Sequence, residues 1–419
     1  MEKVDLDFSL EAVPNNHRSG FGKILVVMLG LTFFSASMWS GGELGQGLSF
    51  MQFLVIVLIG NLILGLYTGA LAYIAAKTGL STHLLARYAF GEKGSYISSF
   101  LLSFTQIGWF GVGTAMFAYP VQKVTGANIY LLIIIAGILM TLTVVFGMKG
   151  LVVISFIAVP LITILGSTSV FKAVDSMGGY GALTAYEPAE QIGLAAALTI
   201  CIGSFISAGT LTPDFTRFSR KKISAVIATV IAFFIGNTLM FVFGAVGSIA
   251  TGEADISEVM FMQNLIVPAI IVLGLNIWTT NDNALYASGL GLSNITKISR
   301  KKVVIFNGLV GTIGAMWLYN HFVDFLTVLG SALPPIGAII LADFFILNRG
   351  HYKPFHEMTF RGFNWIAVLA WGLGIVAATV IPGIPPINAL IGSAVMYVLI
   401  SKVVDNIKVN KSVTTTEKV

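Results

Sequence analysis

A run of hydroxyl and amide side chains interrupts one apolar segment of this 419-residue chain, in the stretch NIWTTNDNALYASG at 276–289. Asn276, Thr279, Thr280 and Asn283 are spaced i, i+3, i+4 and i+7, which places them on one face of a helix. Oxygen ligands of this kind suit a hard cation such as Na⁺. The pattern therefore predicts a cation site, and the alternative is a polar network between packed helices.

Two stretches rich in Gly and Ser lie inside other apolar segments, GLTFFSASMWSGG at 30–42 and GSFISAGTLT at 203–212. One interpretation is close helix packing, because Gly203 and Ser207 fit a small-xxx-small pattern. The other is an unwound helix, which hydrocarbon tolerates only beside protein or a polar cavity. The stretches fall in the first and sixth apolar segments, where secondary transporters built from inverted repeats place their broken helices. We therefore predict two broken helices, one in each of these stretches.

An amide and an indole lie midway along the third apolar segment, in FTQIGWFGVG at 104–113. Gln106 and Trp109 are spaced i, i+3, and an indole at mid-membrane needs a polar partner or a ligand. With Phe205 and Asn276, they offer aromatic faces and carboxamides but no charge. Stacking is worth about 1–3 kcal/mol per base, and an amide supplies both a donor and an acceptor. The combination predicts a flat, neutral, heteroaromatic ligand.

The elements that carry these residues are membrane-spanning helices. Hydrophobic residues make up 56% of the chain and charged residues 10%, against about 25% charged in soluble domains. The apolar runs exceed the roughly 18 residues that indicate a span. We predict an all-α polytopic membrane protein with twelve spans, near 22–44, 52–76, 95–120, 129–147, 150–172, 192–212, 223–250, 262–290, 303–321, 323–347, 364–382 and 386–402.

Basic residues are unequally divided between the two sides that this arrangement creates. One side, which includes both tails, holds 22 of the 24 Lys and Arg residues. The other holds only Lys123 and Lys172, beside six carboxylates. The positive-inside rule then places both termini in the cytoplasm. It also explains the net charge of +5 without a nucleic-acid partner, and RKK at 220–222 and 300–302 is interpreted as membrane anchors.

Several classes of protein do not fit the sequence. The single cysteine, Cys201, excludes an internal disulfide, and the sequence has no nucleotide-binding P-loop, zinc pair or nucleophile elbow. We therefore expect neither an enzyme nor an ATP-driven pump, and no cofactor other than a coupling ion. No obligate protein partner is predicted. A channel would not need a ring-binding slot or paired broken helices, and a receptor would need a signalling domain.

The sequence resembles the nucleobase–cation symporter family in GLTFFSASMW, TQIGWFGVG, GSFISAGTLTPDF and LNIWTTNDNALYASGLG. The resemblance covers most of the chain and includes LPPIG and ADFF near 333–345. It implies the LeuT-like fold, with two inverted five-helix repeats at 21–172 and 192–347, two further helices at 364–402, and cytoplasmic tails at 1–20 and 403–419. It also implies cation-coupled import of cytosine, and of close analogues such as 5-fluorocytosine, by alternating access across a bacterial inner membrane. Purine, hydantoin and allantoin carriers of the same fold are the alternatives.

The resemblance also implies roles for individual residues. The cation would bind main-chain oxygens of Gly30, Phe33 and Asn276 and side-chain oxygens of Thr279 and Thr280. The base would lie between Trp109 and Phe205, beside Phe33. Gly203, Ser204 and Ser207 would frame the second helix break, where main-chain groups would bind the base. Gln106 and Asn276 are our own candidates for the polar contacts, because the residues that supply them in the related hydantoin carrier are absent here. Three positions depart from the related hydantoin carrier, which has Trp, Gln and Asn where this chain has Phe205, Phe34 and Leu285.

The coupling ion is either Na⁺ or H⁺. Na⁺ needs only the oxygen cage, whereas H⁺ needs a titratable group in the membrane, for which Asp282 and then Glu43 are the candidates. Asp282 lies about 240° around the helix from Asn276 and should point away from the cation face, pairing with a neighbouring helix. The sequence therefore favours Na⁺. Near the cytoplasmic surface, Asp214 and Arg217 are predicted to form a local ion pair or a gate latch.

Overall fold

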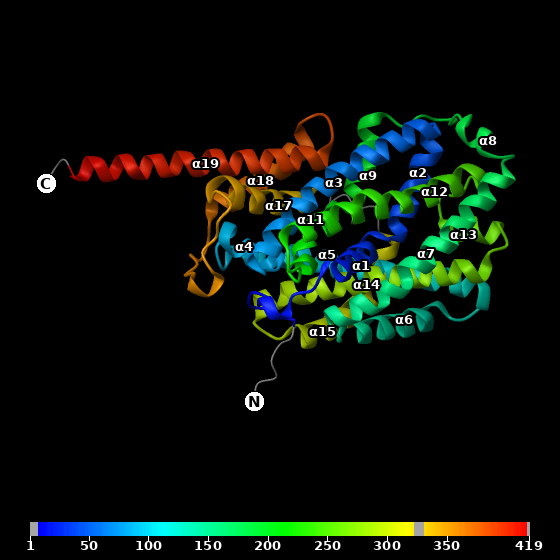
Figure 1. Cartoon of the computed structure of the whole chain (residues 1–419), viewed down its shortest axis with the longest axis horizontal. Coiled ribbons are helices and arrows are strands. Elements are labelled where there is room, and N and C mark those ends of the chain that lie inside the picture. The colour runs from blue at the N-terminus through cyan, green and yellow to red at the C-terminus, as the bar shows by residue number, and fades with distance from the viewer. Residues whose placement is uncertain (1–6, 322–330, 417–419) are drawn as a thin grey trace.

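Long helices run lengthwise through the molecule, and the described part of the chain begins and finishes toward the same end of the bundle (Figure 1). The computed structural model describes residues 7–321 and 331–416, with side chains as far as residue 407. The described residues form helices and one isolated parallel bridge, between Ser19 and Ser219, but no sheet.

Six helices are long and apolar enough to cross a membrane, and a bent pair adds a seventh candidate span. The pair is α1 (Phe21–Thr32) and α2 (Ser35–Gly47), and the direction of the chain bends by 53° between them. The six are α3 (Phe50–Thr78), α5 (Gly94–Thr125), α7 (Met148–Ser176), α11 (Lys222–Ile231) with α12 (Thr238–Thr251), α15 (Arg300–Asn320) and α19 (Pro385–Thr416).

The remaining helices are shorter or more polar. The shorter apolar ones are α6 (Ile129–Val144), α9 (Leu194–Gly209), α17 (Pro334–Ala342, continued by a π turn to Leu347) and α18 (Trp365–Val380). The polar stretch lies in α14 (Ile266–Thr296), and the connecting helices are α4 (Thr82–Phe90), α8 (Tyr180–Thr184), α10 (Thr212–Thr216) and α13 (Ile256–Met262). The twelve spans and the two repeats stay predictions, and the first part of the predicted tenth span, as far as residue 330, lies outside the described residues.

The first predicted break is present. Phe33 ends α1 with φ −77° and ψ 85°, and Phe34 begins α2 in an extended conformation, with φ −129° and ψ 130°. Farther along, α2 packs closely on α12, since a Cβ added to Gly244 would lie 1.8 Å from the main-chain oxygen of Met38. The Gly- and Ser-rich stretch of the first span therefore contains both a break and a close helix contact.

The second break lies farther along the chain than predicted, and its predicted framing by Gly203, Ser204 and Ser207 is wrong. These residues lie inside α9, which continues to Gly209; the chain turns at Thr210 and Leu211 before α10 begins. Pro213 explains the position. It has no N–H to donate to the carbonyl of Gly209, four residues earlier, and its ring would crowd that carbonyl. The proline, rather than the small residues before it, sets the end of α9.

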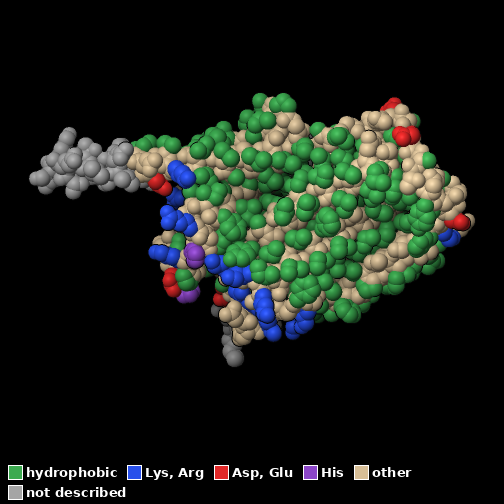
Figure 2. Space-filling model, turned by 45° about the horizontal axis from the view of Figure 1, so that its top comes forward, with side chains coloured by type: hydrophobic (Ala, Val, Ile, Leu, Met, Phe, Trp, Pro, Cys, Tyr) green, Lys and Arg blue, Asp and Glu red, His purple; other side chains and the backbone are tan. Residues whose placement is uncertain are grey.

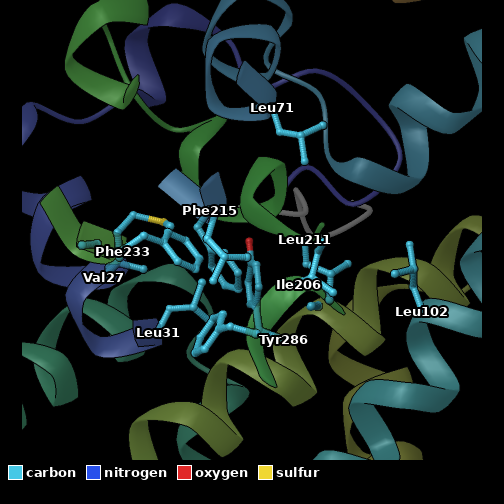
Figure 3. Close-up of a cluster of buried hydrophobic side chains, with 14 of the residues drawn as sticks. Val27, Leu31, Leu71, Leu102, Ile206, Leu211, Phe215, Phe233 and Tyr286 are labelled. Atoms are coloured by element: carbon cyan, nitrogen blue, oxygen red, sulfur yellow. The ribbon is translucent and has the colours of Figure 1, made fainter. Parts of the chain in front are cut away.

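A buried apolar cluster fixes the broken helices against α14 (Figure 3). Val27 and Leu31 of α1 meet Ile206 of α9 and Phe215 of α10, and Tyr286 of α14 lies among them. All five side chains are buried. The cluster therefore holds both breaks in one place in the bundle.

The surface in Figure 2 is apolar along its middle and charged at its ends. Most of the visible Lys and Arg side chains gather at the end where the termini lie, together with a few Asp and Glu, whereas the other end shows mainly Asp and Glu. This division is the one on which the predicted orientation rests.

Candidate substrate and cation sites

A small cavity of about 30 Å³ lies where the first broken helix meets α5, α9 and α14, and we call it the inner slot. This volume holds about one water molecule. Its lining is Leu31 and Phe34, Gln106 and Trp109 of α5, Ser204, Phe205, Ser207 and Ala208 of α9, and Thr280, Asn281 and Ala284 of α14. The structure thus brings together five of the residues predicted to contact the substrate: Gln106, Trp109, Ser204, Phe205 and Ser207.

Three aromatic rings dominate the inner slot. Phe34 meets Trp109 edge to face, with ring centroids 5.1 Å apart, and meets Phe205 in the same way at 5.9 Å. Phe233 supports Phe205 from behind, at 5.1 Å. Phe34 therefore bridges the two rings between which a flat ligand was predicted to lie. A planar ring can stack there only after Phe34 has moved aside.

The polar edge of the inner slot comes from α5 and α9. Gln106 is buried, and its Nε2 has no hydrogen-bond partner among the described residues. The Ser204 hydroxyl donates to the main-chain oxygen of Cys201 at 2.9 Å, within its own helix. A buried donor without a partner costs about 1–3 kcal/mol. The Gln106 amide is therefore a donor that a ligand would satisfy.

Three residues predicted to contact the substrate do not line the inner slot. A Cβ added to Gly203 would find only Pro386 of α19 within 4 Å, at 3.9 Å. The Phe33 ring packs beside Gly236, and the Asn276 amide faces Met240 Sδ at 3.8 Å. The main-chain roles of Gly203 and Phe33 and the substrate contact of Asn276 stay predictions.

The oxygens predicted to hold a cation lie on α1 and α14. In α14, Thr279 Oγ1 and Thr280 Oγ1 both donate to the main-chain oxygen of Asn276, at 2.9 and 3.0 Å. Gly30 lies in the last turn of α1 and Phe33 follows it, where helix carbonyls lack partners in their own helix. Thr280 also lines the inner slot. The predicted cation site and the slot therefore share a residue.

The surroundings of Gly30 test whether a cation fits. A Cβ there would lie 2.1 Å from Ser155 Oγ, so glycine permits the close approach of α1 to α7. Ser155 Oγ is buried without a hydrogen-bond partner among the described residues. An unsatisfied oxygen beside the partly negative C-terminal end of a helix suits a cation. The described residues contain no cluster of three His, Cys, Asp or Glu side chains that could hold a metal, so the donors here are neutral oxygens.

The buried carboxylates lie away from these oxygens. Asp282 Oδ1 accepts from Thr143 Oγ1 of α6 at 2.8 Å, which confirms that it pairs with a neighbouring helix. The predicted ion pair of Asp214 with Arg217 is wrong. Arg217 Nε donates to the main-chain oxygen of Asp214, while the Asp214 carboxylate accepts from the main-chain N–H of Thr82 at 2.8 Å. The reason is that Asp214 meets the N-terminal end of α4, whose unpaired N–H groups favour an anion.

Sequence reasoning missed five residues of the inner slot as members of the site: Leu31, Phe34, Ala208, Asn281 and Ala284. Ala284 is four residues from Thr280, so the helical period could have found it. Asn281 donates to the main-chain oxygen of Phe110 on α5, at 3.1 Å, and lies off the face that the spacing marked. Phe34 lies in the break itself, where the backbone is not helical and the helical repeat of residues does not apply.

Comparison with known proteins identifies the family of this chain. The profile of the family described as permeases for cytosine/purines, uracil, thiamine and allantoin matches residues 12–404. The chain is 56% identical over 401 residues to cytosine permease of Escherichia coli (strain K12), with 96% of each chain covered. It is 22% identical to hydantoin permease of Microbacterium maritypicum, over 86% of this chain and 81% of that one.

Solved structures show the same fold. Mhp1, a nucleobase-cation-symport-1 family transporter, in a closed conformation with bromovinylhydantoin bound, superposes with a TM-score of 0.84 at 21% identity, covering 95% of both chains. A Na⁺-coupled sialic acid symporter gives a TM-score of 0.71 at 13% identity, covering 94% of both. The extent of the profile match and the 56% identity show that this chain belongs to the family of permeases for cytosine, purines, uracil, thiamine and allantoin.

Proposed function

We propose that this chain imports cytosine together with Na⁺ across a bacterial inner membrane. The observation that carries the proposal is the inner slot, where Trp109, Phe205 and Phe34 surround the unpaired Gln106 amide without a charged side chain. A neutral aromatic base with donors and acceptors on its edge fits this lining. The 56% identity to cytosine permease supports cytosine as that base.

On binding, the ring of cytosine would take the place that the ring of Phe34 now occupies between Trp109 and Phe205. The slot of about 30 Å³ must widen, and Phe34 must turn out of the space between Trp109 and Phe205. Cytosine then stacks there, and the Gln106 amide pairs with the polar edge of the base. A base with the wrong edge would leave the buried amide unpaired, at a cost of about 1–3 kcal/mol.

Na⁺ would couple to the base through α14. The hydroxyls of Thr279 and Thr280 now donate to the oxygen of Asn276 and would turn their lone pairs toward the ion. Carbonyls at the end of α1 would supply the remaining ligands, so that the ion ties α1 to α14. Because Thr280 belongs to both sites, an ordered cation site also orders one wall of the slot.

Transport would follow by alternating access, with both termini in the cytoplasm. An inside-negative potential drives a bound Na⁺ inward by about 2.3 kcal/mol per charge per 100 mV. A carrier exchanges substrate on one side of the membrane for substrate on the other, and a channel does not. Uptake of labelled cytosine into vesicles preloaded with unlabelled cytosine (counterflow) therefore distinguishes this mechanism from that of a channel.

Uptake of radiolabelled cytosine into proteoliposomes tests the coupling ion. An imposed Na⁺ gradient should drive uptake, and Thr280→Ala should lower it about tenfold or more, because an oxygen contact to a charge is worth about 1.5–3 kcal/mol. Asp282→Asn is the matched control, since it alters the other face of α14. Uptake that follows an imposed pH gradient, ignores Na⁺ and fails in Asp282→Asn would instead establish proton coupling.

A further inference from the structure

A second cavity, of about 410 Å³, lies at the end of the molecule opposite the termini, beside α13 (Figure 1). We call it the outer vestibule. Its lining includes Ser35 and Trp39 of α2, Tyr119 and Gln122 of α5, Asp255 at the start of α13 and Tyr319 of α15. None of these residues belongs to the inner slot.

The outer vestibule and the inner slot are lined by successive turns of the same helices. On α5, Met116 of the vestibule is seven residues from Trp109 of the slot, and on α14 Leu273 is seven residues from Thr280. Seven residues of helix span about 10 Å. Between the two cavities, Phe34 faces the slot and the next residue, Ser35, faces the vestibule. The first helix break is therefore the partition between them.

The vestibule combines aromatic rings with an available carboxylate. Tyr119 and Tyr319 form a ring pair with centroids 4.8 Å apart, and Trp39 adds an indole. Asp255 Oδ1 caps α13 by accepting from the main-chain N–H of Ser257 at 2.8 Å, and in the described chain Oδ2 has no hydrogen bond. The one lysine in the lining, Lys123, pairs with Glu258 instead.

An unpartnered polar atom also points to a ligand. Ser35 lines the vestibule, is almost fully buried, and its Oγ has no hydrogen-bond partner among the described residues. A buried hydroxyl without a partner costs free energy that a ligand or a water would recover. The lining thus offers ring faces, a carboxylate acceptor and a hydroxyl.

We propose that the outer vestibule is a second binding site for cytosine, weaker than the inner slot. The base lies against the aromatic wall, and its exocyclic amine donates to Asp255 Oδ2, the pairing that carboxylates make with the amine of cytosine. Uracil has an oxygen at that position and would face the carboxylate unfavourably. The vestibule therefore begins the selection of amino-pyrimidines before a base reaches Phe34. This inference rests on the proposed function.

Thiol protection tests the site directly, because the only native cysteine, Cys201, is buried. Gln122→Cys in the vestibule wall is labelled with a membrane-impermeant maleimide, with and without cytosine. Cytosine should slow the labelling, and the protection should persist when Trp109→Ala has removed stacking in the inner slot. Loss of protection in that double variant, or no protection in a Gln122→Cys protein that still transports, would overturn the inference.

A pair of carboxylate variants, each made in the Gln122→Cys protein, tests the recognition. Asp255→Asn keeps the cap on α13, since Asn also caps helices, but removes the charge. Cytosine should then protect the introduced thiol about tenfold less well, and uracil should compete better, whereas the exposed Asp175→Asn at the same end should leave protection unchanged. Equal protection in both variants would contradict the role of Asp255. A wild-type protein that neither binds nor imports cytosine would overturn the proposed function itself.

Discussion

At the scale of single residues, Phe34 is the side chain that controls the size of the inner slot. Its ring contacts both Trp109 and Phe205 and fills the space between them. Phe34→Ala should enlarge the slot and let a purine such as adenine compete with cytosine, lowering the preference for cytosine by about tenfold. Such a change corresponds to about 1.4 kcal/mol, within the range for lost aromatic contacts. Inhibition of cytosine uptake by unlabelled adenine measures it.

Phe34→Leu is the matched control, because leucine keeps most of the volume without the ring. Adenine should stay excluded, while cytosine uptake weakens. Equal inhibition by adenine in wild type and Phe34→Ala would show that the ring does not set the size limit.

The same residue shows what sequence could and could not predict about the site. Gln106 and Trp109 share a helical spacing at mid-span, and the structure places both on one cavity. Phe34 lies in a non-helical junction, where spacing says nothing about direction. The resemblance singled it out only as a departure from the hydantoin carrier. Which rings Phe34 contacts depends on the 53° bend between α1 and α2, and residue spacing does not determine that angle.

At the scale of helices, both breaks could be predicted, but only the first lies where the sequence placed it. Gly and Ser at 203–207 satisfied the compositional pattern for a break, yet α9 runs through them. These residues allow a helix to continue as readily as to end, whereas Pro213 removes a specific hydrogen bond four residues earlier. A backbone argument from the proline would have placed the break at Thr210 and Leu211.

Two glycines with different surroundings test the helix contacts. A Cβ at Gly244 would meet the main-chain oxygen of Met38 at 1.8 Å, so Gly244→Ala should push α12 away from α2. We expect a loss of about 1–3 kcal/mol of stability, seen as a lower Tm in detergent, and weaker uptake. Gly203→Ala meets only Pro386, at 3.9 Å, and should be neutral within about 0.5 kcal/mol. If Gly203→Ala is the more harmful change, Gly203 has a role in the break that this packing does not show.

At the scale of the whole molecule, the N-terminal segment closes the end of the bundle where the termini lie. Asp7 accepts from Arg300 at the start of α15, with Nη2 and Oδ2 2.6 Å apart. Arg217, which follows α10, donates to the main-chain oxygens of Asp7 and Phe8 and to the Tyr286 hydroxyl of α14, at 2.7, 2.8 and 3.3 Å. Both arginines are fully buried. A short segment thus joins α10 to α14 and α15. Under the proposed alternating-access mechanism, these helices would have to separate for the slot to open toward this end.

Breaking this link should therefore favour opening at the terminal end. Asp7→Asn leaves Arg300 buried without its counter-charge, and removal of one partner of a buried ion pair costs about 3–5 kcal/mol. The unpaired buried charge destabilises the state that is closed at the terminal end, because the Asp7–Arg300 pair belongs to that state. A cysteine introduced at the second break, Leu211→Cys, should therefore react roughly tenfold faster or more with a thiol reagent applied from that side. Glu92→Gln is the control: its pair with Lys297 is exposed, with 3.6 Å between the charged atoms, and such pairs contribute about 0–1 kcal/mol. Equal labelling rates in the two variants would mean that the segment stabilises the fold without governing access.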